Sequence, residues 1–405
     1  MGMIINQCNI YTLLWCYYFW HSNSFATSDI YSRALLLFSI AMSLYYALIV
    51  NIQYKVPCYF KGVNVLFIMF SVYGIARYSE GSVLLLDGTT IDGYYSLKKI
   101  YISILPTYAY YHFSKQGLLN EKVLKVYSAL FLILCFLAYN SYYSKHFGID
   151  YDDSIERTNN TGYFFLAMLP IITIWKDRPI LQYFLLSIVI VMLFFCFKRG
   201  AIFSGCLCTI VFLYLSLKNS SKRRKFLLLF LTSVLLVVAY YLVSYLFENS
   251  YYFNLRYERT IEGDANGRDI IYPLFWNYLK NLTSSKLLFF GGGFDYSIKN
   301  FGIYCHNDWF EMAINHGILG VVCYIYYWHC FIKNIRCKKE NKAIFSAMII
   351  FFIFSFFNTF YSFSINSLII FSTSMFGYCL ASKDNSVKVI TKKMSYEKSN
   401  IFNSN

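Results

Sequence analysis

Charged side chains are scarce in this 405-residue sequence. Asp, Glu, Lys and Arg together make up 14% of it, against roughly 25% in soluble domains. Hydrophobic residues make up 58% and aromatic residues 21%. So little charge among so many apolar side chains excludes an ordinary soluble domain and indicates an integral membrane protein.

Acidic residues are fewer than basic ones, 21 against 36, which gives a formal net charge of +15. Such a charge is also found in nucleic-acid-binding proteins. The Lys and Arg residues, however, form neither a basic domain nor one amphipathic stripe, because they lie in links between apolar runs. They therefore indicate membrane topology, and we expect no nucleic-acid partner.

The sequence also lacks the cysteine and histidine spacings of metal sites and disulfide frameworks. None of its twelve cysteines form a CxxC pair, and His306 and His316 are ten residues apart. We therefore expect no metal and no cofactor. Most cysteines lie in apolar runs and are expected to be buried small hydrophobic residues: Cys135, Cys196, Cys206, Cys208, Cys323 and Cys379.

No Lys or Arg precedes the first apolar segment, and no small-residue cleavage site is obvious after it. We therefore predict a first membrane span there, not a removed signal peptide. Helices are expected because lipid offers no water to unpaired backbone groups, and the β-barrel alternation is lacking. About twelve apolar segments are long enough to cross a ~30 Å hydrocarbon core: residues 4–20, 34–51, 62–77, 100–114, 126–142, 160–175, 179–197, 200–217, 226–247, 309–332, 343–361 and 363–381.

Basic and acidic residues alternate between successive links, and this alternation orients the predicted helices. The clearest anchor is the basic run at residues 222–225, which the positive-inside rule places in the cytoplasm. Counting along the chain places most other lysine-bearing links and both termini on that side. Most acidic residues then lie in the opposite links, with Lys98-Lys99 as the exception.

The predicted organisation is all-α, with one long extracytoplasmic loop. That loop has about sixty residues, whereas ordinary connections have about 4–6. Such a polar interruption in an apolar chain is where chemistry is expected. The segments are N-terminal helices at 1–157, further helices at 158–247, the loop at 248–308, C-terminal helices at 309–381 and a cytoplasmic tail at 382–405.

A helix is predicted inside the loop, beginning at Asn266-Gly267 and running to Leu282, with Arg268 near its start. Its apolar side chains are expected to lie against the membrane surface. They are Ile270, Leu274, Trp276 and Tyr278.

Five basic residues occupy the predicted outer side: Lys198, Arg199, Arg256, Arg259 and Arg268. Arg199 lies in a very short link between two apolar segments, so it must face protein or a wet cavity. A guanidinium binds phosphate through paired hydrogen bonds and stays charged at any relevant pH. The simpler alternatives are that Lys198 and Arg199 extend to lipid headgroups, and that Arg256 and Arg259 pair with nearby acids.

Two further motifs lie in the loop. A neutral imidazole at His306 could accept a proton from an attacking hydroxyl, with Asn307 or Asp308 fixing its orientation; the alternative is an interfacial histidine bonded to backbone. Gly291-Gly292-Gly293 permits close approach to a ligand but also suits a simple turn, and no GK[ST] follows as a P-loop requires. Further along, Gly317 and Gly320 are predicted helix-packing positions.

Together these residues resemble the O-antigen ligase and polymerase superfamily. The resemblance covers roughly residues 158–332. Lys198 stands where that family usually has serine, and Tyr272 stands where a tryptophan is common. The residues that carry the resemblance are Lys198-Arg199-Gly200-Ala201, Gly267-Arg268, Gly291-Gly292-Gly293-Phe294, His306-Asn307 and Gly317-Ile318-Leu319-Gly320.

The resemblance implies a GT-C-like fold and glycosyl transfer at the outer face of a bacterial cytoplasmic membrane. The donor would be a glycan on polyprenyl diphosphate, and neither nucleotide sugar nor metal would be needed. Arg199 and Arg268 would hold the diphosphate and stabilise its charge as it leaves. His306 would assist the acceptor hydroxyl, whose attack predicts inversion. Lys198, Arg256, Arg259, Asn307, Gly292 and Gly293 would contribute to substrate binding.

Within this family, we favour a polymerase of O-antigen or capsular repeat units, because the match is loose and the chain is rich in Tyr, Phe, Asn and Ile. A ligase that passes the glycan to lipid A-core or protein is the main alternative. A lipid-glycan flippase would also have about twelve spans, but transporters usually place charged residues in mid-span, and the predicted spans have none near their centres. A chain-length regulator and a flippase are possible partners.

Overall fold

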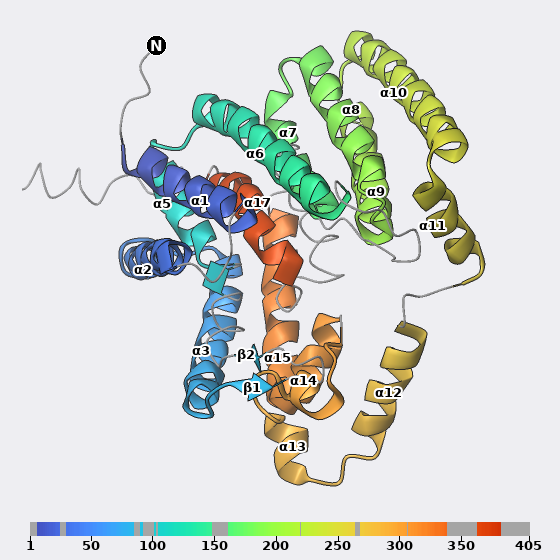
Figure 1. The fold of residues 1–405 in the computed structure, drawn as a ribbon. Helices are drawn as coiled ribbons and strands as arrows, with labels where there is room; N and C mark the ends of the chain where they lie inside the picture. The colour runs from blue at the N-terminus through green and yellow to red at the C-terminus, as the bar shows by residue number, and fades with distance from the viewer. Residues whose placement is uncertain are drawn as a thin grey trace, which may run out of the picture.

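The computed structural model describes residues 6–24, 30–84, 90–91, 101–102, 104–147, 161–218, 220–263, 268–305, 307–337 and 363–381. Within these ranges the regular structure is helical, apart from one antiparallel pair of two-residue strands, β1 (Val83–Leu84) and β2 (Thr90–Ile91) (Figure 1). The all-α class predicted from composition is therefore confirmed.

The helices follow one another with short connections. Those before the outer loop are α1 (Gln7–Ser24), α2 (Ile30–Gln53), α3 (Cys58–Ser79), α5 (Pro106–Lys115), α6 (Glu121–Phe147), α7 (Gly162–Ile172), η1 (Thr173–Trp175), α8 (Pro179–Phe195), α9 (Arg199–Lys218) and α10 (Lys222–Asn249). The rest are α11 (Tyr251–Ile261), α12 (Arg268–Lys280), α13 (Ser285–Phe290), α14 (Tyr296–Phe301), α15 (Asp308–Cys337) and α17 (Phe363–Ala381).

Helices overlap every predicted span except the one at 343–361, which lies outside the described residues. Within the described ranges, five helices are long and apolar enough to cross a membrane: α2, α3, α6, α9 and α10. They indicate a multi-pass membrane protein. By contrast, α5 has ten residues, which is about 15 Å of helix, or half of a ~30 Å hydrocarbon core.

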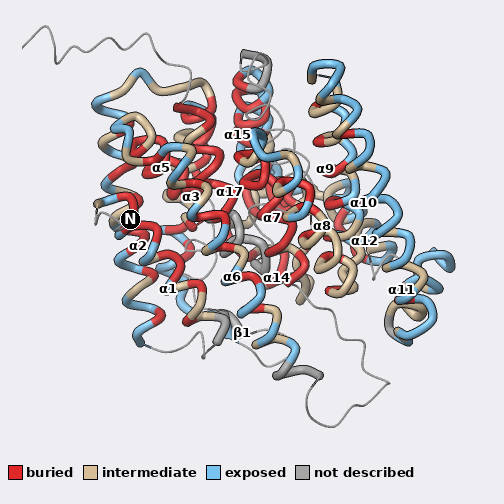
Figure 2. The backbone as a smooth tube through the Cα atoms, turned by 90° about the horizontal axis from the view of Figure 1, so that it is seen from above, coloured by how far each residue is buried: buried red, intermediate tan, exposed pale blue. Residues whose placement is uncertain are grey.

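Aromatic side chains fill the interior, where α1, α5, α7 and α17 are largely buried (Figure 2). The ring of Tyr11 meets those of Tyr46, Tyr110 and Phe113 edge to face, with centroids 5.5–5.8 Å apart. Five of the six cysteines in apolar runs are buried as predicted. Cys206 is the exception, because it lies on an exposed face of α9.

Polar contacts join the links that the sequence places on the basic side. Gln116 donates to the Tyr54 hydroxyl at 3.2 Å, Lys176 pairs with Glu121 at 3.2 Å, and Arg224 donates to the backbone carbonyl of Lys176. Since residues 116–121 form one link between α5 and α6, all these contacts lie at the same end of the bundle. The alternation of charge thus predicts correctly which links lie together.

The outer loop makes its contacts with different links. Arg77 at the end of α3 pairs with Asp295, and Arg199 between α8 and α9 donates to Thr260 of α11. α12, α13 and α14 gather around the part of α15 that lies farthest from α5 (Figure 1). The chain therefore has two distinct polar ends, one with the basic links and one with the loop. Lys98-Lys99, the exception in the charge pattern, lies outside the described residues.

α15 consists of two helices joined at a kink. Gly317 has φ 62° and ψ −156°, and a β-carbon there would lie 2.6 Å from the nitrogen of Gly291 and 2.7 Å from the carbonyl oxygen of Leu288. Only glycine fits such a position. The sequence predicts Gly317 as a helix-packing position inside a span at 309–332, but the structure interrupts this segment. Residues 308–316 belong with the loop, and the apolar stretch begins after the kink.

Candidate functional site

The link that carries Arg199 is a tight turn. α8 ends at Phe195, Phe197 takes a left-handed φ of 52°, and α9 begins at Arg199. Such a φ is uncommon outside glycine, so packing must hold this turn in place. The Arg199 guanidinium donates through Nη1 to Oγ1 of Thr260 at 3.3 Å. The turn is thereby attached to α11, the loop helix that also carries Arg259.

Arg268 is the first residue of α12, as the sequence predicts. Its guanidinium is close enough to the Tyr163 hydroxyl at the start of α7 to interact with it electrostatically. The same hydroxyl lies 2.8 Å from the place where a β-carbon of Gly200 would be. Tyr163 therefore adjoins both Arg268 and the start of α9. Two arginine-bearing segments that are distant in sequence meet around one tyrosine.

Tyr163 was not among the sequence-predicted site residues. With 40 tyrosines in the chain, its type carries no signal, and its only local mark is its place at the start of an apolar run. The predicted cations Lys198, Arg199, Arg259 and Arg268 are all partly buried. The side chain of Arg256 lies outside the described residues.

His306 also lies outside the described residues, but both of its neighbours are fixed by Glu311. The backbone N–H of Cys305 donates to Glu311 Oε1 at 2.7 Å, and the backbone carbonyl of Asn307 accepts from the Glu311 N–H at 3.0 Å. Oδ1 of Asn307 accepts from the N–H of Trp309 at 2.9 Å, so this side chain caps α15. The predicted base is therefore flanked by anchored backbone at the start of a helix.

The glycine triplet packs against the kink of α15. The N–H groups of Gly292 and Gly293 donate to the carbonyls of Ile314 and Asn315 at 3.1 and 2.8 Å. Gly291 has φ 69°, and a β-carbon there would lie 2.4 Å from the Asn315 backbone. These two N–H groups are thus engaged within the protein. The triplet holds the loop on α15, and a substrate contact at Gly292 or Gly293 would use other surfaces of these residues.

A fully buried carboxyl lies beneath the loop, and the sequence gave no reason to select it. Glu311 accepts hydrogen bonds from Ser297 Oγ at 2.8 Å, Asn315 Nδ2 at 2.7 Å and the Cys305 N–H. Burial deprives the charged form of water and raises the pKa of Glu311 to about 7; the negative charge of Asp295 acts in the same direction. This carboxyl therefore titrates near neutral pH.

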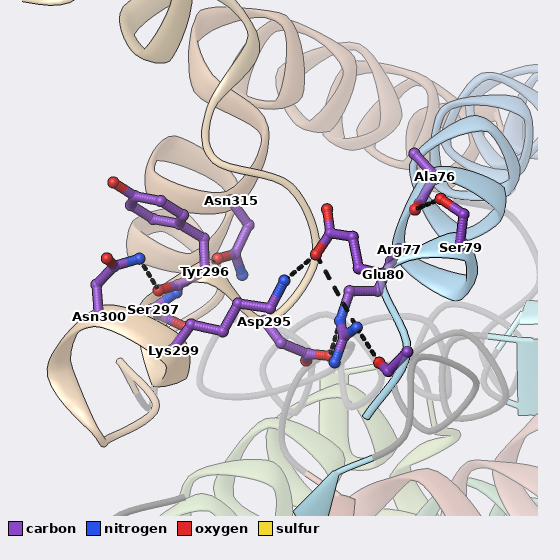
Figure 3. Close-up of polar contacts among 11 residues, drawn as sticks. Ala76, Arg77, Ser79, Glu80, Asp295, Tyr296, Ser297, Lys299, Asn300 and Asn315 are labelled. Atoms are coloured by element: carbon purple, nitrogen blue, oxygen red, sulfur yellow. Dashed lines mark hydrogen bonds and ion pairs between the residues drawn. The ribbon is translucent and has the colours of Figure 1, made fainter. Parts of the chain in front are cut away.

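Asp295 joins the loop to α3 through a buried ion pair (Figure 3). Its Oδ2 lies 3.3 Å from Nε of Arg77, and the two side chains are 0% and 1% exposed. Arg77 also donates to the carbonyl of Gly81 at 2.6 Å, and Lys299 pairs with Glu80 beside them. The sequence missed this pair because Arg77 follows an apolar run, where a cation ordinarily reaches for lipid headgroups.

His316, the residue before the kink, is surrounded by aromatic rings. Its ring centroid lies 4.4 Å from that of Tyr73, 4.8 Å from Phe294 and 5.5 Å from Phe70. Burial lowers its pKa to about 3, so the ring is neutral. His316 therefore packs the kink against α3 and the loop.

The fold and these contacts define a helical multi-pass membrane protein with a structured loop, in which two partly buried arginines adjoin one tyrosine. No family model matches the chain, and no curated protein matches it. The resemblance to the O-antigen ligase and polymerase superfamily therefore rests on the residues named above. Within the described ranges, no three His, Cys, Asp or Glu side chains are grouped as metal ligands.

Proposed function

We propose that this protein is a membrane glycosyltransferase that polymerises oligosaccharide repeat units linked to polyprenyl diphosphate. The proposal includes about twelve membrane helices in a GT-C-like arrangement, cytoplasmic termini, and a site on the outer face of a bacterial cytoplasmic membrane. One observation carries it: Arg199 and Arg268 belong to segments that meet around Tyr163 at the loop end.

Two partly buried guanidinium groups suit a diphosphate. Each forms paired hydrogen bonds with phosphate oxygens, and each is more effective away from bulk water. In the proposed reaction the acceptor hydroxyl oxygen attacks the anomeric carbon of the donor. The bond from that carbon to the diphosphate oxygen breaks, and its electron pair leaves on polyprenyl diphosphate. Arg199 and Arg268 stabilise this developing charge.

The acceptor proton passes to His306 in this scheme. The residue follows Cys305 and precedes Asn307, both anchored through Glu311, so its backbone position is restricted. Because the oxygen attacks opposite the departing diphosphate, the anomeric configuration inverts. The donor supplies its own leaving group, and the proposed reaction uses no nucleotide, metal or other cofactor.

A ligase would use the same groups to pass the finished glycan to lipid A-core or protein. The two activities differ in what remains when the protein is lost. Cells that lack a polymerase should carry single repeats on their lipid anchor, whereas cells that lack a ligase should carry a bare anchor. A gel of the surface glycan distinguishes these outcomes, and an unchanged pattern would refute both.

Point variants test the roles of individual residues in the same gel. We expect Arg199→Lys to abolish the long-chain ladder, because an ammonium keeps the charge but not the paired hydrogen bonds. His306→Ala should abolish it as well. Arg223→Lys, a matched change in the basic link at the opposite end, should keep the ladder. A full ladder from His306→Ala would remove that residue from the mechanism.

A further inference from the structure

α12 has two inward-facing sides. Ile271 and Phe275 are buried, and the Phe275 ring lies 5.1 Å from that of Phe301 of α14. A second side is formed by residues 274, 277, 278 and 281, which share one helix face because they are spaced by three and four positions. This second side lines a cavity.

The cavity lies among α12, α13 and α14, at the base of the loop in Figure 1, and has a volume of about 380 Å³. Ligand pockets usually measure about 300–1,000 Å³. Its lining residues, all described, include no charged side chain. It therefore offers nothing to neutralise a phosphate or a carboxylate.

One wall of this cavity is aromatic. The Tyr278 hydroxyl donates to that of Tyr296 at 3.2 Å, and the ring of Tyr278 lies 5.1 Å from that of Phe301 at 78°. Asn277 and Asn281 lie on the same helix face one turn apart. Both are exposed, and in the described part of the chain their carboxamides make no hydrogen bond.

This combination suits an uncharged sugar. Sugar hydroxyls both donate and accept hydrogen bonds, as a carboxamide does, while the C–H face of a pyranose packs on an aromatic ring. An acyl or prenyl chain would leave the carboxamides unsatisfied. Asn277 and Asn281 lie nine and thirteen residues after Arg268, which corresponds to roughly 13–20 Å along the helix. A ligand here is remote from the diphosphate.

We propose that this cavity, the loop pocket, binds an uncharged sugar unit of the glycan at a distance from the bond being formed. The proposal rests on the proposed function, because it assigns the pocket to the same lipid-linked substrate. Asn277 and Asn281 bind the sugar hydroxyls, and the Tyr278 and Tyr296 wall packs against the ring. The pocket thus recognises the repeat unit, while the arginines hold its lipid diphosphate.

The test uses the full-length protein in nanodiscs and saturation-transfer NMR with lactose, maltose and chitobiose, three neutral disaccharides. We expect saturation of the protein's aromatic protons to reach at least one of them. The Asn277→Ala/Asn281→Ala double variant should weaken its binding about fivefold or more, the loss expected for two neutral hydrogen bonds. Asn249→Ala, a matched exposed asparagine at the end of α10, should bind as the wild type does.

Three results would overturn the loop pocket: no transfer to any of the three disaccharides, equal binding by the double variant, or equal competition from digalacturonic acid. Arg268→Ala separates this proposal from the proposed function. It should abolish glycan transfer and keep disaccharide binding. If Arg268→Ala keeps glycan transfer while the double variant loses disaccharide binding, the loop pocket is supported and the assigned chemistry fails.

Discussion

The buried pair of Arg77 and Asp295 gives the sharpest prediction about stability. Asp295→Asn keeps the shape of the side chain but removes its charge, and it leaves Arg77 in a site where 1% of that side chain is exposed. Breaking a buried pair in this way usually costs about 3–5 kcal/mol, because one charge stays buried without compensation. Arg77 keeps its bond to the Gly81 carbonyl, so we expect the lower figure, about 3 kcal/mol.

The loss should be local. Arg77 belongs to α3 and Asp295 to the loop, so the variant should release the loop before the rest of the fold. A cost of about 3 kcal/mol raises the population of the released form by a factor of about a hundred. Trypsin cleavage at Lys280 or Lys286 should accelerate accordingly, because both lysines lie in the loop.

The control is an ion pair at the other end of the bundle. Lys176 and Glu121 are 47% and 37% exposed, so Glu121→Gln should cost at most about 1 kcal/mol. The double variant Arg77→Met/Asp295→Leu removes both buried charges and should recover most of the stability. Loop cleavage no faster in Asp295→Asn than in Glu121→Gln would refute the reasoning, as would a double variant worse than the single one.

Two further predictions concern the contacts beneath the loop. The pKa of Glu311 is about 7 when folded and ~4.3 when unfolded, so the protonated form favours folding, and stability should fall on the order of 3 kcal/mol as pH rises from below 4 through 7. Thermal unfolding at pH 5 to 8 should show a falling Tm that Glu311→Gln flattens; identical slopes would count against it. Gly291→Ala should destabilise by about 1–3 kcal/mol more than Gly263→Ala, since both have positive φ but only Gly291 would meet backbone at 2.4 Å. Equal losses in chemical unfolding would contradict this.

The features that sequence predicted well are those that the membrane imposes locally. Apolar runs of fixed length mark helices, and charge in the links sorts them into two ends, so contacts such as Lys176 with Glu121 follow from the pattern. The loop helix beginning at Arg268 was predicted from the residues just before it. Each of these inferences needs only neighbouring residues.

What sequence missed depends on partners far apart. Asp295 follows the glycine triplet and looks like an ordinary loop acid until Arg77, 218 residues earlier, is placed beside it. Glu311 resembles a flanking charge at the start of a span, and only the fold shows that it is buried. Gly317 resembles a packing glycine, yet its kink is set by contact with Gly291. Sequence patterns contain no term for such meetings.

The outermost helix, α10, has a further consequence. Only 11% of its most apolar stretch is buried, and its buried residues are Leu228, Leu235 and Leu246 (Figure 2). Lipid is indifferent to which apolar side chain it meets, so most positions of α10 are constrained in hydropathy but not in identity. Ancestry in such a helix fades quickly from the residues, and it persists longest at the few positions, such as Arg199 or Gly317, where one chemistry alone will serve.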